Sequence, residues 1–249
     1  MIEKKRQKQI LDLLARQGAV SVKQLTDALY VSEATVRRDL CDLEKMGMIK
    51  RTFGGAVPVS EVNHQIPLLV RESMNSAAKN EICRRASALV KDGDVIFLDG
   101  SSTAQYMVKY LKQYSNLIVV TNGLKIAELL SDAPQIKTYC TGGQMVPNSL
   151  VFVGRHAEAM AATVNIDICF VACRGINDKG VFSDSTEPET IVRRHFLNCS
   201  KMRVFLMTSE KIGKTYMHTL CHANEVDYVI SDGQLPEGLK LRSREKGGA

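Results

Sequence analysis

Residues 20–57 read VSVKQLTDALYVSEATVRRDLCDLEKMGMIKRTFGGAV, and this stretch decides the fold of the N-terminal part of the chain. Ser21 and Gln24 match a capping box, which predicts a helix over residues 22–29. Ser32 predicts another N-cap shortly afterwards, and apolar residues at helical spacing follow it. Two short helices joined by a tight turn are typical of a helix-turn-helix.

The segments on both sides of this pair complete a larger unit. Apolar residues on one face predict a preceding helix over residues 2–17. After the third helix, residues 48–53 have the pattern of a strand, two glycines mark a turn, and residues 56–59 form the returning strand. We therefore expect a winged helix-turn-helix DNA-binding domain over residues 1–57.

The third helix carries the residues expected to read DNA. An α-helix fits the major groove of B-DNA, and Arg can form two hydrogen bonds to guanine. We expect Arg37 and Arg38 to contact DNA rather than to form an ordinary solvated helix face. The sequence leaves open whether Asp39 orients one of them or makes only a weak helix-face ion pair. The expected DNA contacts are Lys23, Gln24, Ser32, Glu33, Thr35, Arg37, Arg38, Lys50, Arg51 and Thr52.

Charge and composition agree with this interpretation. Residues 1–57 hold 11 Lys and Arg against 7 Asp and Glu, an excess of four within a net charge of +6 for the chain of 249 residues. A basic module on a nearly neutral body favours a polyanionic partner. Apolar runs stay short of the ~18–20 residues that a membrane span needs. With seven scattered cysteines and no export signal, we expect a cytoplasmic protein without membrane contact or metal site.

The rest of the chain has the pattern of an α/β domain. Residues 58–74 begin with a proline-containing stretch that lacks periodicity, and we expect them to be a linker. Beyond them, helical patterns alternate with short apolar strands at residues 95–98, 117–120, 135–140, 166–172, 204–207 and 228–230. This alternation predicts a mainly parallel sheet covered on both faces, over residues 75–235. Residues 236–249 are expected to be a tail.

Several of the expected strands end in residues that suit an anionic ligand. Ligands of such sheets bind outside the carboxyl ends of the strands. Glycine lets backbone N–H groups approach a phosphate, and hydroxyl and amide groups supply further hydrogen bonds. Each loop alone is also what an ordinary turn looks like, but their convergence predicts a pocket for an anion. These exits include Asp99-Gly100-Ser101-Ser102-Thr103, Thr121-Asn122-Gly123, Thr141-Gly142-Gly143-Gln144 and Cys173-Arg174-Gly175, with Lys211 and Lys214 after the fifth.

The N-terminal motif resembles the DeoR-type winged helix-turn-helix. The family pattern V-S-x-x-T-[IV]-R-R-D-L-x-x-L-E-x-x-G and its basic wing ending in G-G-A are matched by Val31-Ser32, Thr35-Val36-Arg37-Arg38-Asp39-Leu40, Leu43-Glu44, Gly47 and Gly54-Gly55-Ala56. Tyr30 departs from the pattern, because it stands where glycine usually makes the turn, and we expect either strain or a slightly different angle there. Thr26 departs too, standing where such units usually pack Ala.

The resemblance extends over roughly residues 1–231, so the body resembles the DeoR-type effector domain. It implies a fold similar to ribose-5-phosphate isomerases and a phosphorylated sugar as effector. It also implies a regulator, usually a repressor, of sugar-metabolism genes that acts as a homo-oligomer, a dimer or a tetramer, on double-stranded operator DNA. On the last helix, Glu189, Arg193 and Arg194 are candidates for the Glu and the basic residue that the family supplies. The expected effector contacts are Arg71, Lys79, Asp99, Gly100, Ser101, Ser102, Thr103, Thr121, Asn122, Gly142, Gly143, Arg174, Gly175, Glu189 and Lys211.

Two other functions remain as alternatives. A sugar-phosphate isomerase with a DNA-binding appendage needs a general base placed against a C–H bond. The comparable strand exit, residues 172–175, holds no carboxylate pair, so we expect no catalytic residues and no cofactor. A constitutive DNA-binding scaffold without a ligand is the other alternative, and a screen of sugar phosphates distinguishes it.

Overall fold

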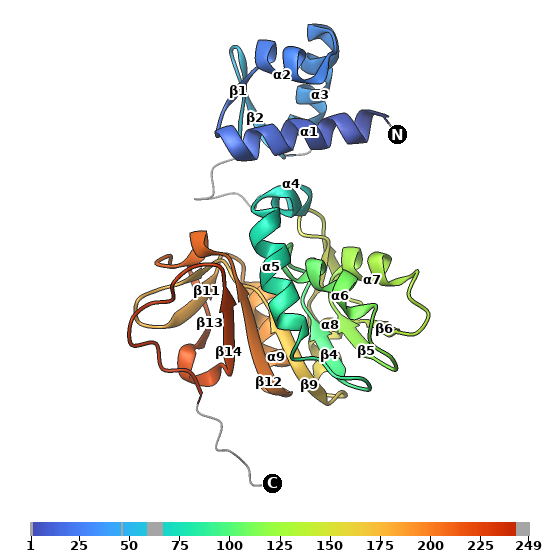
Figure 1. Ribbon diagram of the computed structural model, residues 1–249, viewed down its shortest axis with the longest axis vertical. Coiled ribbons are helices and arrows are strands. Elements are labelled where there is room, and N and C mark those ends of the chain that lie inside the picture. Colours follow the sequence, from blue (N-terminus) through green and yellow to red (C-terminus); the bar gives the residue numbers. More distant parts are fainter. Residues whose placement is uncertain (1, 46, 59–66, 243–249) are drawn as a thin grey trace. The chain divides into compact units, whose positions relative to one another are not determined.

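The computed structural model describes residues 2–45, 47–58 and 67–242, and the chain divides into two compact units, Met1–Ser76 and Ala77–Ala249 (Figure 1). Each unit has its own hydrophobic core. Among the described residues, no helix has the length and apolar character required to cross a membrane.

The N-terminal unit is a winged helix-turn-helix, as predicted. Three helices pack against a small antiparallel sheet in the order β1-β3-β2, in which β2 and β3 form the wing. Its elements are α1 (Ile2–Gln17), β1 (Val20–Ser21), α2 (Val22–Leu29), α3 (Glu33–Lys45), β2 (Ile49–Thr52), β3 (Gly55–Pro58) and α4 (Leu68–Ser73). Its core includes Leu25 from α2, Val36 and Leu40 from α3, and Ile49 from β2, so the three segments support one another.

The helix signals that the sequence predicted are present. The Ser21 hydroxyl accepts a hydrogen bond from the backbone N–H of Gln24, and the Gln24 side chain accepts one from the Ser21 backbone, which completes the capping box. Ser32 caps α3 by accepting from the N–H of Thr35 at 3.3 Å. Tyr30 takes the left-handed conformation at φ 54°, and its side chain is exposed. The strain expected at this turn is therefore real, since an L-residue in this region costs about 1–2 kcal/mol.

Asp39 has a different partner from those that the sequence suggested. Its carboxylate is buried and accepts hydrogen bonds from the Arg6 guanidinium of α1, one of them at 2.9 Å between Nη2 and Oδ1. Neither Arg37 nor Arg38 is involved, so both alternatives for Asp39 were wrong. Because Asp39 faces inward while the two arginines face solvent, its charge ties α3 to α1 instead of orienting the reading residues.

The segment expected to be a linker contains a helix. Residues 59–66 of the expected linker lie outside the described residues. Residues Leu68–Ser73 form α4, in which Val70 is buried in the N-terminal core and packs alongside α1. The apolar residues of LLV explain the helix, because they give it a face to bury.

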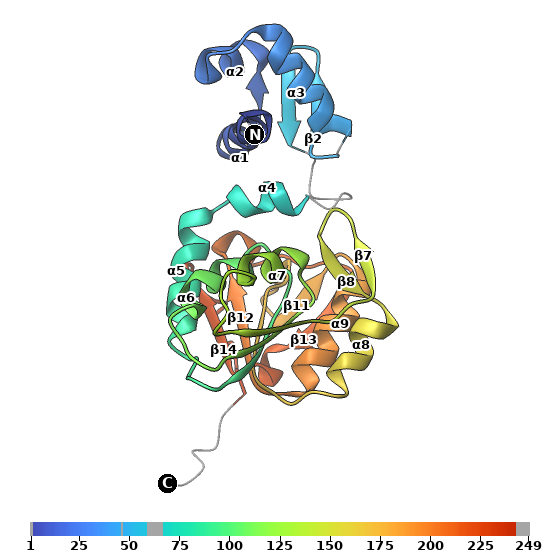
Figure 2. The same ribbon diagram turned by 90° about the vertical axis from the view of Figure 1, so that its right-hand side faces the viewer.

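The C-terminal unit is built on a six-stranded parallel sheet in the order β14-β12-β9-β4-β5-β6, whose strands are labelled in Figure 1. Two of them, β12 and β14, are also labelled in Figure 2. The strands are β4 (Val95–Leu98), β5 (Ile118–Thr121), β6 (Lys137–Cys140), β9 (Ile166–Val171), β12 (Ser200–Met207) and β14 (Tyr228–Ser231). The main helices are α5 (Ser76–Ser87), η1 (Ala104–Met107), α6 (Val108–Leu111), α7 (Leu124–Leu130), α8 (Arg155–Ala161) and α9 (Glu187–Asn198). The predicted parallel sheet is thus confirmed.

Alternating residues of the strands face two separate cores, so the sheet is covered on both sides. Ile96 and Leu98 pack with α5, α6 and α7, whereas Phe97 between them packs with α8 and α9. Phe97 stacks on Phe196 of α9, with ring centroids 3.8 Å apart. Because successive side chains of a strand point to opposite faces of the sheet, β4 lies between helices of both layers.

Further antiparallel strands were not predicted. One group has the order β10-β11-β13, formed by β10 (Gly175–Ile176), β11 (Val181–Asp184) and β13 (His218–His222), and β13 lies against α9. Another is the hairpin of β7 (Gln144–Val146) and β8 (Val151–Val153). Most of these strands have short or partly polar sequences, and the exception is the apolar VFV of β8.

Candidate DNA interface and ligand site

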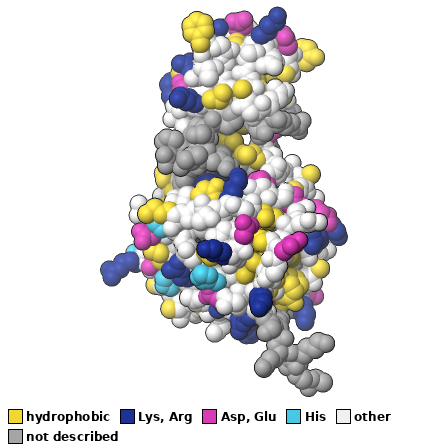
Figure 3. Space-filling view, turned by 90° about the vertical axis from the view of Figure 1, so that its left-hand side faces the viewer, with side chains coloured by type: hydrophobic (Ala, Val, Ile, Leu, Met, Phe, Trp, Pro, Cys, Tyr) yellow, Lys and Arg dark blue, Asp and Glu magenta, His cyan; other side chains and the backbone are white. Residues whose placement is uncertain are grey.

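The predicted DNA contacts come from three neighbouring parts of the N-terminal unit. Lys23 is exposed on α2, Arg37 and Arg38 are exposed on α3, and Lys50, Arg51 and Thr52 are exposed on β2. Lys and Arg side chains stand on the surface of this unit in the view of Figure 3. Helix α2 packs against α3, as in the helix-turn-helix units with which other proteins bind DNA.

Some of these side chains already have partners within the unit. Arg37 Nη2 lies 3.4 Å from Glu33 Oε2 on the same exposed helix face, where such a pair contributes little to stability. Arg51 is held more firmly, since its backbone N–H and its Nε both donate to Glu44 of α3, at 2.9 and 2.7 Å. The hydroxyls of Ser32 and Thr35 lie 3.0 Å apart. Arg51 therefore fixes the wing against α3.

The C-terminal unit has a topological switch point between β4 and β9. From β4 the strand order runs outward through β5 to β6, and from β9 it runs the other way through β12 to β14. In open α/β sheets, the crevice outside the carboxyl ends of the strands at such a point is where ligands bind. The loop 99–103 follows β4 at this place, and Cys173 follows β9.

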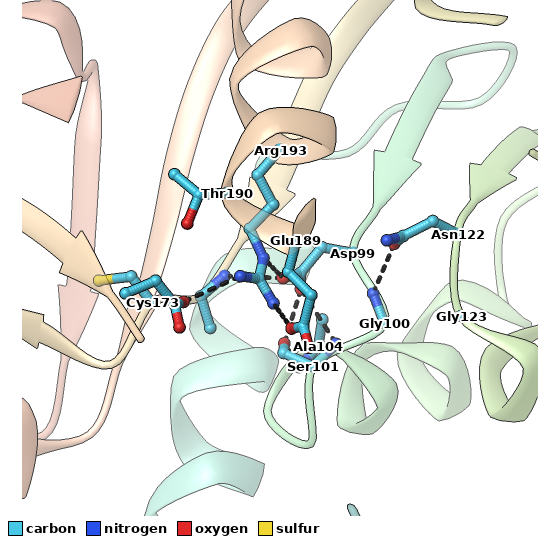
Figure 4. A network of polar contacts seen from close by, with 12 residues as sticks. Asp99, Gly100, Ser101, Ala104, Asn122, Gly123, Cys173, Glu189, Thr190 and Arg193 are labelled. Atoms are coloured by element: carbon cyan, nitrogen blue, oxygen red, sulfur yellow. Dashed lines mark hydrogen bonds and ion pairs between the residues drawn. The ribbon is translucent and has the colours of Figure 1, made fainter. Parts of the chain in front are cut away.

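A buried network of charges joins the ends of these strands (Figure 4). Arg193 of α9 donates from Nε to Asp99 at 2.8 Å, from Nη1 to Asp184 at 2.8 Å and from Nη2 to Glu189 at 3.0 Å. Burial by itself lowers the pKa of Arg193, but the three carboxylates outweigh it and hold that pKa above its ordinary value. Arg193 is therefore a permanent buried cation that gathers three segments of the chain.

Asp99 is completely enclosed and shapes the loop that follows it. One carboxylate oxygen accepts from the Ser101 hydroxyl at 2.6 Å and from the Ser101 backbone at 3.3 Å. The other accepts from Arg193 and from the backbone N–H of Ala172 after β9. The Ser101 hydroxyl in turn accepts from Ala104 at the start of η1. Asp99 therefore has the contacts of a positioning residue.

A buried ammonium group lies beside the hydroxyl groups of the same loop. Lys79 of α5 is only 3% exposed, and its Nζ donates to the Ser102 hydroxyl at 3.2 Å. Thr103 is fully buried, and its Oγ1 has no hydrogen-bond partner among the described residues. A buried hydroxyl without a partner costs roughly 1–3 kcal/mol, so such a group is a mark of functional sites.

Two other expected effector contacts form hydrogen bonds with the end of β4 and with the loop 99–103. Asn122 Oδ1 accepts from the Gly100 N–H at 2.9 Å, and the Thr121 hydroxyl donates to the Leu98 carbonyl at 2.6 Å. A Cβ atom on Gly100 would stand 2.9 Å from the Cα of Gly123 and collide with Val151, so the two loops need glycine to meet. The side-chain oxygens of Asn122 and Thr121 are thus engaged within the unit.

The remaining expected contacts belong to several different elements. Arg174 pairs with Asp184 at 3.4 Å, which brings it to the network. Burial raises the pKa of Cys173 to about 12. Lys211 directly precedes Ile212, which forms an isolated bridge with Ile176 in the segment after β9. Gly175 is buried where a Cβ would collide with the Lys214 carbonyl oxygen. By contrast, Gly142 and Gly143 follow β6, two strands from β4, and Arg71 belongs to α4 of the N-terminal unit.

Sequence reasoning missed part of this site. Asp184 ends β11, a strand that was not predicted, and Ser149 donates to Glu189 at 2.8 Å from the β7–β8 hairpin. Ser185 and Thr186, which lead into α9, have buried hydroxyls without a partner among the described residues. A usable signal did exist, because Glu189 and Arg193 stand four residues apart on one helix face.

Two surface cavities lie elsewhere on this unit. A cavity of about 500 Å³ is lined by residues of the turn 178–180, of η3 (Ala223–Glu225) and of 238–240, and a second of about 270 Å³ adjoins Arg194 and Arg203. Because η3 precedes β14, both lie toward the amino ends of the strands. Neither contains an expected effector contact. Among the described residues, no group of three or more His, Cys, Asp or Glu side chains is arranged to hold a metal ion.

The fold and these two sites define a helix-turn-helix transcriptional regulator with an α/β sensor domain. The family profile "DeoR-like helix-turn-helix domain" matches residues 6–62, and the profile "DeoR C terminal sensor domain" matches residues 74–233. The chain belongs to the DeoR family of transcriptional regulators.

Similar proteins carry the same kind of name. The uncharacterized HTH-type transcriptional regulator YulB of Bacillus subtilis is 32% identical over 99% of this chain and 95% of its own length. The regulator GolR of Listeria innocua is 31% identical over 97% and 95%, and the repressor GlcR of Bacillus subtilis is 31% identical over 93% and 89%. Among solved structures, ribose 5-phosphate isomerase A of Methanocaldococcus jannaschii matches 55% of each chain at 16% identity, with a TM-score of 0.42.

Proposed function

We propose that this chain is a sequence-specific repressor of sugar-metabolism genes, controlled by a phosphorylated sugar bound where β4 and β9 end. Similar proteins include GlcR and a putative repressor of the aga operon of Escherichia coli, which supports repression as the mode of action. Helix-turn-helix proteins read paired half-sites, so the acting form is a homo-oligomer, a dimer or a tetramer.

One observation carries the ligand part of the proposal: the buried ammonium group of Lys79 beside the hydroxyl-bearing loop at the switch point. The network next to it holds three carboxylates against the cations of Arg193 and Arg174, a net charge of −1. The negative network repels an anion, whereas the ammonium group of Lys79 attracts one. We therefore place the phosphate toward Ser102 and Thr103 and the sugar hydroxyls toward Glu189, whose carboxylate is a good acceptor for them.

Within this proposal Arg37 and Arg38 read bases in the major groove, and Lys23 and Lys50 contact phosphates. Side-chain contacts of these two kinds separate sequence recognition from general affinity. The ligand would act by favouring one relative placement of the DNA-reading units of the oligomer, and so would change the affinity for paired half-sites.

A thermal-shift screen tests the ligand site. Wild-type protein is heated with pentose and hexose phosphates, with the same sugars lacking phosphate, and with inorganic phosphate. A true ligand at ~100 times its Kd should stabilise the native protein by about 2.7 kcal/mol. The shift should vanish in Lys79→Met and Ser102→Ala and persist in Arg84→Ala, a control on the exposed side of α5. Failure of every phosphorylated sugar to shift the wild-type transition contradicts the proposal and favours a ligand-free scaffold.

A further inference from the structure

Phe53, at the tip of the wing, is the most exposed large apolar side chain among the described residues. Its relative exposure is 107%, whereas Ile49 and Ala56 of the same hairpin are 3% and 1% exposed. The ring therefore adds nothing to the core of the N-terminal unit. Single exposed apolar side chains are common on protein surfaces, so the support and the surroundings of this ring decide what it can contact.

The tip that carries this ring is held in place from two sides. Arg51, two residues before it, makes two hydrogen bonds to Glu44 of α3. Gly54, directly after it, accepts a hydrogen bond from the backbone N–H of Val22 at 2.8 Å, at the start of α2. A Cβ on Gly55 would collide with the Val20 carbonyl oxygen, so that glycine lets the wing lie close against β1. The backbone that carries the ring is thus already fixed in the free protein, so little conformational entropy is lost when the ring binds a partner.

The surroundings of the ring identify the chemistry of its partner. The exposed Lys50 and Thr52 lie on the same strand, and the exposed Lys23 and Gln24 lie in the first turn of α2, which the Val22–Gly54 bond brings beside the tip. Cations and hydroxyls around an apolar ring fit a partner whose phosphates surround a narrow apolar recess. The minor groove of B-DNA is about 6 Å wide, and apolar side chains inserted there pack on base steps and unstack them.

We infer that Phe53 enters the minor groove of the operator, beside the major-groove segment read by α3, and packs against the edges of a base step. This inference rests on the proposed DNA-reading function and adds a contact that carries no charge. It assigns the wing two separate tasks: Lys50 contributes affinity through phosphates, and Phe53 contributes preference for base pairs that leave the groove open and deformable.

Binding titrations with the full-length protein test this inference. Wild-type protein first selects an operator duplex from random-sequence DNA, and anisotropy titrations at several salt concentrations then compare variants. Phe53→Ala should bind roughly tenfold more weakly at every salt concentration, with the salt dependence unchanged, because the ring neutralises no phosphate. Phe53→Leu should recover most of the affinity. Lys50→Ala should instead reduce the slope of log K against log salt by about 0.9. Met217→Ala, which removes an equally exposed apolar side chain from the C-terminal unit, is the control and should bind as wild type.

Base-pair analogues locate the contact in the groove. Replacing G·C by inosine·C removes the guanine amino group from the minor groove and leaves the major-groove edges unchanged. At the positions under the wing this replacement should strengthen wild-type binding but not Phe53→Ala binding. Two results overturn the inference: Phe53→Ala within twofold of wild type, or an inosine effect of the same size in both proteins. If Arg37→Ala also binds as wild type, the DNA-reading function itself fails, which is a distinguishable outcome.

Discussion

The Nε atom of Arg193 lies 2.8 Å from Oδ2 of Asp99, although the two residues are 94 positions apart in the sequence. The bond joins α9 to the loop after β4, and the same guanidinium also holds Asp184 and Glu189. All four side chains are buried. The proposed ligand site is thus built around a charged cluster. A ligand that moves α9 would also move the loop 99–103, because the Arg193–Asp99 bond connects them.

Replacing Arg193 by Met should destabilise the C-terminal unit by about 3–5 kcal/mol, because three buried carboxylates lose their common cation. Urea unfolding followed by circular dichroism measures the change, with the two units allowed separate transitions. Arg84→Ala, which breaks the exposed 2.7 Å pair with Glu81, is the matched control and should leave the midpoint almost unchanged. A loss below about 1 kcal/mol in Arg193→Met would show that the network is not a structural centre.

Gly100→Ala should destabilise the same unit by about 1–3 kcal/mol, since the added methyl group has no space between Gly123 and Val151. The measurement is the urea midpoint of the C-terminal transition. Gly142→Asn serves as control: Gly142 has φ 66° but open space around its Cα, and Asn tolerates the left-handed conformation. Equal stability of Gly100→Ala and wild type would mean that the two loops do not meet as described.

The helix-turn-helix was predictable residue by residue because its signals are local. Ser21 and Gln24 lie within one turn of helix, and the apolar residues of α2 and α3 repeat at short spacing. The partner of Asp39 was not predictable in this way. Arg6 is 33 positions earlier, and only the packing of α1 against α3 brings the two together.

The ligand site shows the same division between local and long-range features. The loop 99–103 stood out because glycine and hydroxyl residues follow an apolar strand. Its surroundings depend on the sheet order, which places β9 next to β4, and on strand β11, whose VFSD sequence gives no strong strand signal. For that reason the charge network around Arg193 could not be derived from spacing, although Glu189 and Arg193 were both visible candidates.

Tyr30→Gly should stabilise the N-terminal unit by about 1 kcal/mol, because glycine adopts φ 54° without the steric cost that tyrosine bears. The exposed ring makes no core contact that its removal would sacrifice. Thermal unfolding of the N-terminal transition measures the effect, and Tyr30→Ala, which keeps the steric cost, should show no gain. A lower stability for Tyr30→Gly would contradict the assignment of strain to this turn.

Cysteine labelling tests the arrangement of the sheet. Cys140 is exposed on the edge strand β6, whereas Cys173 is buried at the end of β9, where burial raises its pKa to about 12. Because the thiolate is the reactive form, native protein treated with an alkylating reagent near pH ~8 should be modified at Cys140 long before Cys173. Mass spectrometry of peptides reads the order. Labelling of Cys173 at the same rate in the native state would mean that the end of β9 is open to solvent.

The most direct test of the account is the operator affinity of the full-length protein with and without a phosphorylated sugar. With the ligand found by thermal shift, wild-type affinity should change by at least ~5-fold, and the same sugar without phosphate should have no effect. Lys79→Met should keep the ligand-free affinity and lose the response, whereas Arg37→Ala should lose ~1–3 kcal/mol of specific binding. An operator affinity that no phosphorylated sugar alters, in a protein that binds one, would contradict the claim that this site controls DNA binding.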